Sequence, residues 1–150
     1  MGQMKKSLMV VALVLMMVLA ACGGKAATGG VPADAALKIT GNVNGEVGWS
    51  EKDIRAMKTA QTEFTNKDGV TNTYTGVPLN DLLDKAGVKS GATALVFVAD
   101  DGFTSEVDLA EVKACTNCIV GFRDEGGFVM VMPGFSNKAQ VRGVIEIQVK

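Results

Sequence analysis

Two cysteines, Cys115 and Cys118, are separated by two residues, a spacing that serves dithiol exchange, half of a zinc site or a structural disulfide. Zinc needs two further thiolate or imidazole ligands, and the chain has no histidine and only one other cysteine, Cys22. Covalent haem attachment needs a histidine directly after the second cysteine, where this chain has Ile119. A redox-active dithiol normally places its first cysteine at the start of a helix, whereas this pair follows a predicted helix end. A structural disulfide is therefore predicted, and dithiol exchange is the alternative.

A possible ligand pocket is predicted from polar, charged and aromatic side chains near strand ends and turns. Arg123 and Arg142 are the basic groups expected to meet a small anionic ligand, although solvated or paired arginines are the ordinary alternative. A core role is the alternative for the aromatic members, because the chain contains one tyrosine, one tryptophan and six phenylalanines. The predicted pocket residues are Tyr74, Thr75, Asp100, Asp101, Phe103, Arg123 and Arg142.

Two further groups of side chains have ligand chemistry but also ordinary structural uses. Asp100, Asp101 and Asp108 offer the oxygen ligands that calcium prefers, yet aspartates in such positions also cap turns and helices. Met130 and Met132 lie on one side of a predicted strand and could meet Cu(I), whereas core packing is the commoner use of methionine. No catalytic residue and no metal ligand is therefore predicted.

The first part of the chain has the layout of a secretory signal. Lys5 and Lys6 precede an almost wholly apolar run at residues 8–21, which is too short to span a bilayer comfortably. The Leu-Ala-Ala-Cys segment at 19–22 resembles the lipobox of bacterial lipoproteins, which implies that Cys22 is acylated and becomes the N-terminus after cleavage. The lipid bilayer is then a partner through Cys22 acylation, because two acyl chains hold a protein firmly on a membrane. An uncleaved membrane anchor with an incidental cysteine is the alternative.

These features predict a lipoprotein signal peptide at 1–21, a Gly- and Ala-rich flexible tether at 22–36 and one globular domain at 37–150. The domain is expected to be lipid-anchored to the cell membrane and to face the periplasm or the cell exterior, where a cysteine pair is normally oxidised. Of the 15 basic residues, Lys5 and Lys6 fall in the signal, which leaves 13 basic and 16 acidic residues in the mature chain. A net charge near minus three argues against nucleic acid as a partner.

Hydrophobic periodicity predicts the elements that must position these side chains. Alternation of apolar and polar residues indicates half-buried strands, and turn sequences such as Asn44-Gly45 join them into hairpins. Pro78 is expected to be the first residue of a helix whose buried stripe ends at Ala86 and whose C-cap is Gly87. Ser50 is expected to cap a second helix at 51–58. Up to that point the predicted elements are strands at 37–43, 47–49, 61–66 and 70–74 and helices at 51–58 and 78–86.

The second half of the chain contains further strands and one more helix. A continuous apolar run at 95–98 indicates a strand covered on both faces, and Asp108 has the spacing of a helix cap. In the last strand, Ile145, Ile147 and Val149 are expected to share one side. The remaining predicted elements are strands at 103–107, 119–122, 128–132 and 144–149 and a short helix reaching Ala114. Together these elements predict an α+β (mixed α/β) domain of mixed sheets with two or three short helices.

A specific succession of motifs runs through most of this predicted domain. The hexapeptide Tyr-Thr-Gly-Val-Pro-Leu at 74–79 is followed by Leu82-Leu83, the turn Asp101-Gly102-Phe103, the segment Val-Met-Pro-Gly at 131–134 and a closing segment at 141–147. This succession resembles the molybdopterin-binding domain of the sulfite oxidase family. The resemblance implies the mixed α/β fold of that family.

The resemblance also implies where a metal ligand would be found. Catalytic members of the family hold molybdenum through a cysteine thiolate upstream of the Tyr-Thr-Gly-Val segment, and they fasten the pterin phosphate with histidine and arginine. In this chain no cysteine lies between Cys22 and Tyr74, and there is no histidine. The position of the metal ligand is therefore empty.

The sequence thus predicts a membrane-anchored extracytoplasmic lipoprotein with an oxidoreductase molybdopterin-binding-like domain that acts as a non-catalytic binding or accessory module. No cofactor is predicted from the residues themselves, and molybdopterin is implied by the resemblance alone. One alternative is an oxidoreductase-class protein that binds molybdopterin without the usual thiolate or exchanges dithiols at Cys115 and Cys118. A third is a structural partner of a membrane redox complex.

Overall fold

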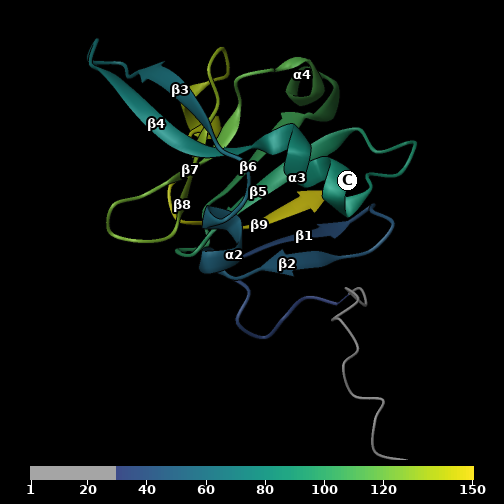
Figure 1. The fold of residues 1–150 in the computed structure, drawn as a ribbon. Helices are drawn as coiled ribbons and strands as arrows, with labels where there is room; N and C mark the ends of the chain where they lie inside the picture. The colour runs from purple at the N-terminus through teal and green to yellow at the C-terminus, as the bar shows by residue number, and fades with distance from the viewer. Residues whose placement is uncertain (1–29) are drawn as a thin grey trace, which may run out of the picture.

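The structure, a computed structural model, describes residues 30–150. The predicted signal peptide, the predicted lipidation residue Cys22 and most of the predicted tether lie outside the described residues. The described part forms an α+β domain of two β-sheets and three α-helices, which confirms the predicted fold class (Figure 1). Within this part, no helix is both long enough and apolar enough to cross a bilayer.

The first sheet comprises five strands, β1 (Leu37–Gly41), β2 (Val47–Trp49), β5 (Ala94–Ala99), β6 (Thr104–Asp108) and β9 (Val144–Val149). Their order is β2-β1-β9-β5-β6, with β1 and β9 parallel and the other neighbours antiparallel. Glu146 joins the two parallel strands, because it accepts a 2.7 Å hydrogen bond from Thr40 and pairs with Lys38 at 3.2 Å. The first and the last described strands are therefore neighbours inside the sheet.

The second sheet comprises four strands, β3 (Ala60–Thr65), β4 (Thr71–Pro78), β7 (Ile119–Phe122) and β8 (Phe128–Val131). Their order is β3-β4-β7-β8, and all neighbours are antiparallel. β4 pairs with β3 from Thr71 to Gly76, but it pairs with β7 only from Gly76 to Pro78. The long hairpin of β3 and β4 consequently extends beyond the body of the domain (Figure 1).

Three helices complete the domain, α2 (Glu51–Arg55), α3 (Leu79–Ala86) and α4 (Leu109–Ala114). The predicted caps are confirmed: the Ser50 hydroxyl accepts from the Asp53 amide at 3.2 Å, and the Asp108 carboxylate accepts from the Glu111 amide at 3.0 Å. Gly87 ends α3 in the left-handed region, with a φ of 66°. α2 ends three residues before the predicted end at Lys58, since the chain must straighten into β3 at Ala60.

β4 continues four residues beyond the strand end predicted at Tyr74, and the helix begins one residue later than predicted. Pro78 is the last residue of β4 and the N-cap of α3, with a φ of −53° and a ψ of 128°, so the helix begins at Leu79. The reason is the neighbouring strand, because the Leu79 amide donates to the Cys118 carbonyl at 3.0 Å. Gly76 lies inside the strand and is not a turn. A Cβ atom there would lie 2.1 Å from the Val120 carbonyl oxygen, so the close approach of β4 and β7 requires glycine.

The prediction that Ile145 lies on the same side of the last strand as Ile147 and Val149 was wrong. The Ile145 side chain is 41% exposed because β9 carries a bulge against β5. Val98 pairs with Glu146 and Ala99 pairs with Val144, which leaves Ile145 without a partner. The extra residue turns Ile145 out of the core.

The main core packs side chains of both sheets and all three helices together. Met130 and Met132 are completely buried in it, so both have a packing role. β5 buries Leu95, Phe97 and Ala99 on one face only, whereas the apolar run predicted cover on both faces. A second, smaller cluster lies on the other face of the four-stranded sheet and consists of Ile119, Val129 and Val131 with the half-buried side chains of Ala60, Phe64 and Tyr74.

Candidate functional site

A recess of about 570 Å³ opens on the four-stranded sheet where β4 and β7 separate. The two strands pair over only three residues each, and their last pair is Gly76 with Gly121. Beyond that pair, residues 72–75 of β4, the last residue of β7 (Phe122) and residues 123–125 after it line the recess, and the two segments no longer pair with each other. Val129 and Arg142 complete the wall on the side of β8.

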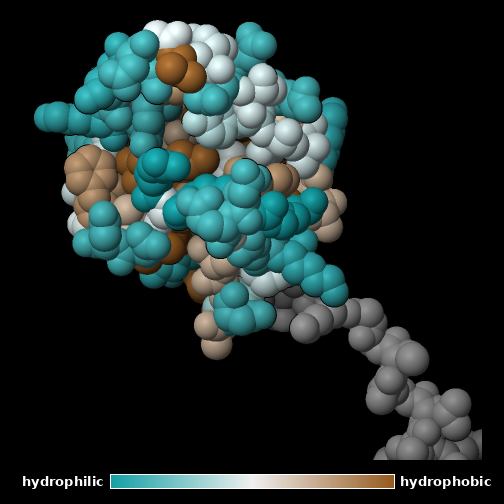
Figure 2. All heavy atoms as spheres, turned by 90° about the vertical axis from the view of Figure 1, so that its left-hand side faces the viewer, coloured by the Kyte–Doolittle hydropathy of each residue, from teal (hydrophilic) through white to brown (hydrophobic). Residues whose placement is uncertain are grey.

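The recess brings together Tyr74, Thr75, Arg123 and Arg142, four of the seven predicted pocket residues. Arg55 also lines it, so three guanidinium groups meet there, together with the carboxylates of Asp124 and Glu125. In Figure 2, which views the molecule from the left-hand side of Figure 1, hydrophobic residues are set between hydrophilic side chains on this side. The arrangement offers hydrogen-bond donors and positive charge to an anion.

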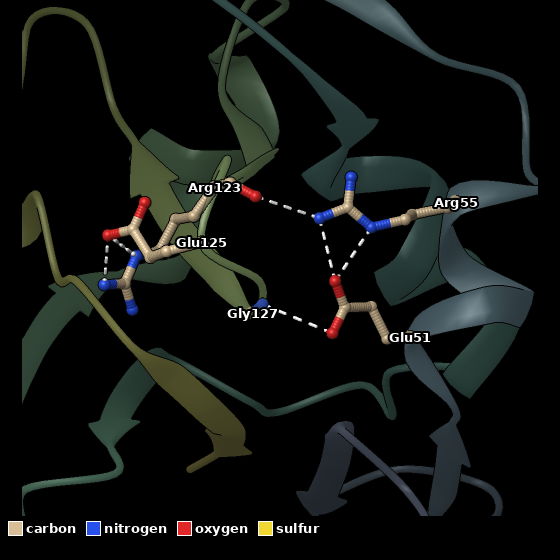
Figure 3. A network of polar contacts seen from close by, with 5 residues as sticks. All are labelled: Glu51, Arg55, Arg123, Glu125 and Gly127. Atoms are coloured by element: carbon tan, nitrogen blue, oxygen red, sulfur yellow. Dashed lines mark hydrogen bonds and ion pairs between the residues drawn. The ribbon is translucent and has the colours of Figure 1, made fainter.

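Arg55 connects α2 to the turn between β7 and β8 (Figure 3). Its Nε atom donates to Glu51 at 2.8 Å, and its Nη2 atom donates to the carbonyl oxygen of Arg123 at 3.0 Å. The other carboxylate oxygen of Glu51 accepts from the Gly127 amide at 3.3 Å. The Arg55 guanidinium also lies 4.7 Å from the centre of the Phe122 ring, a cation–π distance. These contacts fix one wall of the recess.

Two of the three guanidinium groups have a carboxylate partner. The hydrogen bond from Arg55, followed by that from the Gly127 amide, holds the pKa of Glu51 below its ordinary value. Arg123 donates to Glu125 from Nε at 3.1 Å. A backbone hydrogen bond and then this guanidinium hold the pKa of Glu125 below its ordinary value. Both carboxylates therefore stay ionised and offset the charges of Arg55 and Arg123.

Arg142 stands apart from these two pairs. The Met130 amide donates to Val141 and the Gly143 amide donates to Phe128, both at 2.8 Å, so the backbone around Arg142 lies beside β8 like a short extra strand. Its side chain is exposed, and it forms no ion pair with any residue in the range 30–150. Arg142 is thus held in place by its backbone while its guanidinium is available to a ligand.

The other three predicted pocket residues lie at the turn between β5 and β6 and do not line the recess. Asp101 accepts a 2.9 Å hydrogen bond from the Phe103 amide, which is a turn-capping contact. The Asp100 amide donates to the Gly143 carbonyl at 2.9 Å, and Phe103 is 47% exposed. These residues therefore shape the turn, in the way that Asp108 caps α4.

Cys115 and Cys118 form a disulfide with their Cα atoms 5.6 Å apart, so the predicted bond is confirmed. Cys115 is the C-cap of α4, and Cys118 is only 2% exposed and packs in the main core. The loop that the bond closes is also tied to β3, because the Thr62 hydroxyl donates to the Asn117 carbonyl at 2.8 Å. The disulfide precedes β7, whereas the recess begins at the other end of that strand.

The donor atoms of the described residues do not fit a molybdenum–pterin centre. Such a centre needs a soft thiolate, and both cysteines in the range 30–150 are bonded to each other. The whole chain has no histidine, and no cluster of three or more potential metal ligands occurs among the residues that the structure describes. β3, the strand that precedes the strand of Tyr74, offers no thiolate. Its Phe64 packs in the small apolar cluster to which Tyr74 also belongs.

Sequence reasoning missed seven of the eleven lining residues: Arg55, Asn72, Thr73, Phe122, Asp124, Glu125 and Val129. Arg55 looked like an exposed position in a short helix, and only its spacing of four residues from Glu51 indicated a fixed side chain. Phe122 and Val129 looked like ordinary strand residues. They reach the recess because two strands separate, and that event leaves no local pattern in the sequence.

Comparison with known proteins agrees with this architecture. The profile of a family described as the oxidoreductase molybdopterin binding domain matches residues 28–147. Among solved structures, the chain is similar to the sulfane dehydrogenase SoxCD from Paracoccus pantotrophus, with a TM-score of 0.65 and 18% sequence identity. The match covers 75% of this chain and 37% of that chain, and at this identity it concerns the fold. No curated protein matches the sequence.

Proposed function

The chain belongs to the oxidoreductase molybdopterin binding domain family, and from that premise we propose that it is a membrane-anchored extracytoplasmic binding or accessory module without molybdenum chemistry of its own. Acylation of Cys22 would attach it to the bilayer, and the residues between Cys22 and β1 would form the tether. The anchoring part of the proposal is supported by the lipobox-like segment at 19–22.

One observation carries the non-catalytic part of the proposal. The domain retains the family's fold, yet its two cysteines are bonded to each other and leave no free thiolate in the domain. A disulfide sulfur is not a thiolate and cannot serve as the ligand that the metal requires. The absence of histidine from the whole chain removes one of the two donor types, histidine and arginine, that the family uses for the pterin phosphate.

The binding function is supported by the arginine recess. Arg142 has no carboxylate partner among residues 30–150, and Arg55 and Arg123 are held in fixed positions beside it. A small anion in the recess would gain charge-assisted hydrogen bonds without having to displace an existing ion pair of Arg142. We therefore propose the recess as the binding site of the module.

Elemental analysis and native mass spectrometry of the full chain, purified from the membranes of the cells that make it, test the first part. The expected result is a protein with an acyl mass on Cys22 and no stoichiometric molybdenum. A Cys22→Ala variant is the control and should lose the acyl mass. One molybdenum atom per chain would overturn the non-catalytic proposal, and an unmodified Cys22 in the mature protein would overturn the anchoring proposal.

Titration with sodium sulfate, followed by NMR chemical shifts of residues in the recess, tests the binding site. The expected result is saturable binding that is about tenfold weaker in Arg142→Gln, because one charge-assisted contact is lost. Lys67→Gln removes an exposed charge from the hairpin tip and serves as the matched control, with unchanged binding. Equal sulfate affinity in wild type and Arg142→Gln would refute the recess as the binding site.

A further inference from the structure

The arginine recess continues into a second hollow of about 320 Å³ on the same sheet. The two hollows share four lining residues: Asn72, Tyr74, Val129 and Arg142. Tyr74 and Arg142 therefore stand at the junction of the two hollows. Together the hollows form one groove across the outer face of the four-stranded sheet, which we call the sheet groove.

The two ends of the sheet groove differ in chemistry. The first end holds Arg55 and Arg123 with their carboxylate partners. The second end is lined by Phe64 and Val131 and by the uncharged polar side chains of Asn66 and Gln140, and Arg142 at the junction is the one charged residue that lines it. A ligand that fills both ends must therefore be charged at one end and uncharged at the other.

The floor of the uncharged end is apolar for a structural reason. Alternate residues of β7 and β8 point away from the main core, and Val129 and Val131 form the small outer cluster with Ile119. Tyr74 and Phe64 are only half-buried over this cluster, so parts of their rings remain open to a ligand. A flat aromatic body gains most from contact with such a surface, because ring contacts add to simple burial.

The charged end favours a single negative charge. Arg142 is the guanidinium without a carboxylate partner in the part of the chain that the structure describes. Asp124 and Glu125 line the same end, and their charges repel a doubly charged group more strongly than a singly charged one. A carboxylate or sulfonate matches the planar fork of Arg142 and carries only one charge.

From these observations we infer that the sheet groove takes an aromatic organic anion with one negative charge, its anionic group at Arg142 and its ring over Tyr74 and Phe64. The inference rests on the proposed binding function and names the class of ligand. It requires no metal and no covalent step.

A matched set of probes tests the inference on the full chain in lipid nanodiscs. Benzenesulfonate carries the ring and one negative charge, methanesulfonate carries the same charged group without the ring, and benzyl alcohol carries the ring without the charge. Ligand-observed saturation-transfer NMR is expected to show benzenesulfonate binding about tenfold tighter than either partial probe. Partition of the probes into lipid is corrected with nanodiscs that contain no protein, under the same conditions.

Two variants separate the roles of the two ends. Arg142→Gln is expected to weaken the binding of benzenesulfonate and of methanesulfonate alike, by about tenfold. Phe64→Thr, which keeps a strand-forming residue at a half-buried position, is expected to weaken benzenesulfonate binding about threefold and leave methanesulfonate binding unchanged. Lys67→Gln again serves as the control that should change neither probe.

The outcomes distinguish the inference from the function on which it rests. If methanesulfonate binds as tightly as benzenesulfonate, the aromatic ligand class is wrong and the anion site stands. If benzyl alcohol binds as tightly as benzenesulfonate in wild type and in Arg142→Gln, the groove does not select an anion and both proposals are wrong. Absence of binding by both benzenesulfonate and methanesulfonate would likewise overturn both.

Discussion

The two sheets of this domain differ in how completely their central strands pair with their neighbours. In the five-stranded sheet, β9 is paired along both edges, by β1 and by β5, and apart from one bulge its buried side chains enter the core. In the four-stranded sheet, β4 and β7 pair over three residues and then separate, and polar side chains occupy the space between them. Strands that stay paired place their buried side chains in the core, whereas strands that stop pairing leave a recess between them. Function is therefore best sought where pairing stops.

The largest expected effect concerns the contact at which β4 and β7 still meet. Gly76→Ala places a Cβ atom 2.1 Å from the Val120 carbonyl oxygen, within the backbone of the neighbouring strand. We expect a loss of about 3 kcal/mol in the free energy of unfolding, measured with urea, because backbone cannot move aside easily.

Gly45→Ala is the matched control for this change, since a Cβ atom there meets nothing within 4 Å. It is expected to change the free energy of unfolding by less than about 0.5 kcal/mol. If Gly76→Ala were as harmless as the control, the idea that these strands meet at a single tight crossing would be wrong.

The disulfide holds the segment just before β7, whereas the recess begins at the other end of this strand. Replacing Cys115 and Cys118 together with alanine is expected to lower the free energy of unfolding by about 2 kcal/mol, because a short closed loop is released in the unfolded chain. Reduction of the wild-type protein before urea unfolding should produce a similar loss. Free, titratable thiols in protein taken directly from cells would contradict a permanent structural bond.

On the β8 side of the recess, the side chain of Gln140 is bonded to the backbone. Its side-chain amide accepts from the Met132 amide at 2.8 Å and donates to the Met132 carbonyl at 2.7 Å, which fixes the segment that leads to Arg142. Gln140→Ala is expected to cost about 1–2 kcal/mol of unfolding free energy, since two hydrogen bonds are lost. Lys138→Ala, at an exposed position in the same loop, should cost almost nothing. Equal effects of the two variants would show that the loop does not depend on Gln140.

The smallest effect is expected at the Glu51–Arg55 pair, which lies at the rim and is partly exposed. Glu51→Gln should cost only a few tenths of a kcal/mol at neutral pH, because solvent screens such pairs. The pKa of Glu51 is lowered in the folded protein, so its contribution is present above the ordinary pKa near 4.5 and is lost as pH falls through the lowered value.

Urea midpoints of wild type and Glu51→Gln across this pH range test the sign of that dependence. The two midpoints should differ at neutral pH and converge in acid. Glu63→Gln, at an exposed position on β3, is the control without such a difference. A difference that grew as pH fell would mean that the pKa shift has the opposite sign.

Local signals in the sequence predicted the hairpins, the helix caps, the disulfide and the fold class. Ser50, Asp108 and Gly87 act through their nearest neighbours along the chain, so their roles are readable from spacing. The errors at Pro78 and Ile145 have a different origin, since each depends on a partner strand distant in the sequence. The same limit explains the candidate site: Tyr74, Arg123 and Arg142 were recognised as candidates, but their meeting with Arg55 depends on where two strands separate.

The parallel pairing of β1 with β9 also has a consequence for the order of folding. These strands are joined across 106 positions of sequence by the contact between Thr40 and Glu146. Of all the described strands, β9 leaves the ribosome last, and until it arrives β1 and β5 have no common neighbour. The five-stranded sheet therefore closes only after synthesis of its final strand, and such distant pairing slows folding.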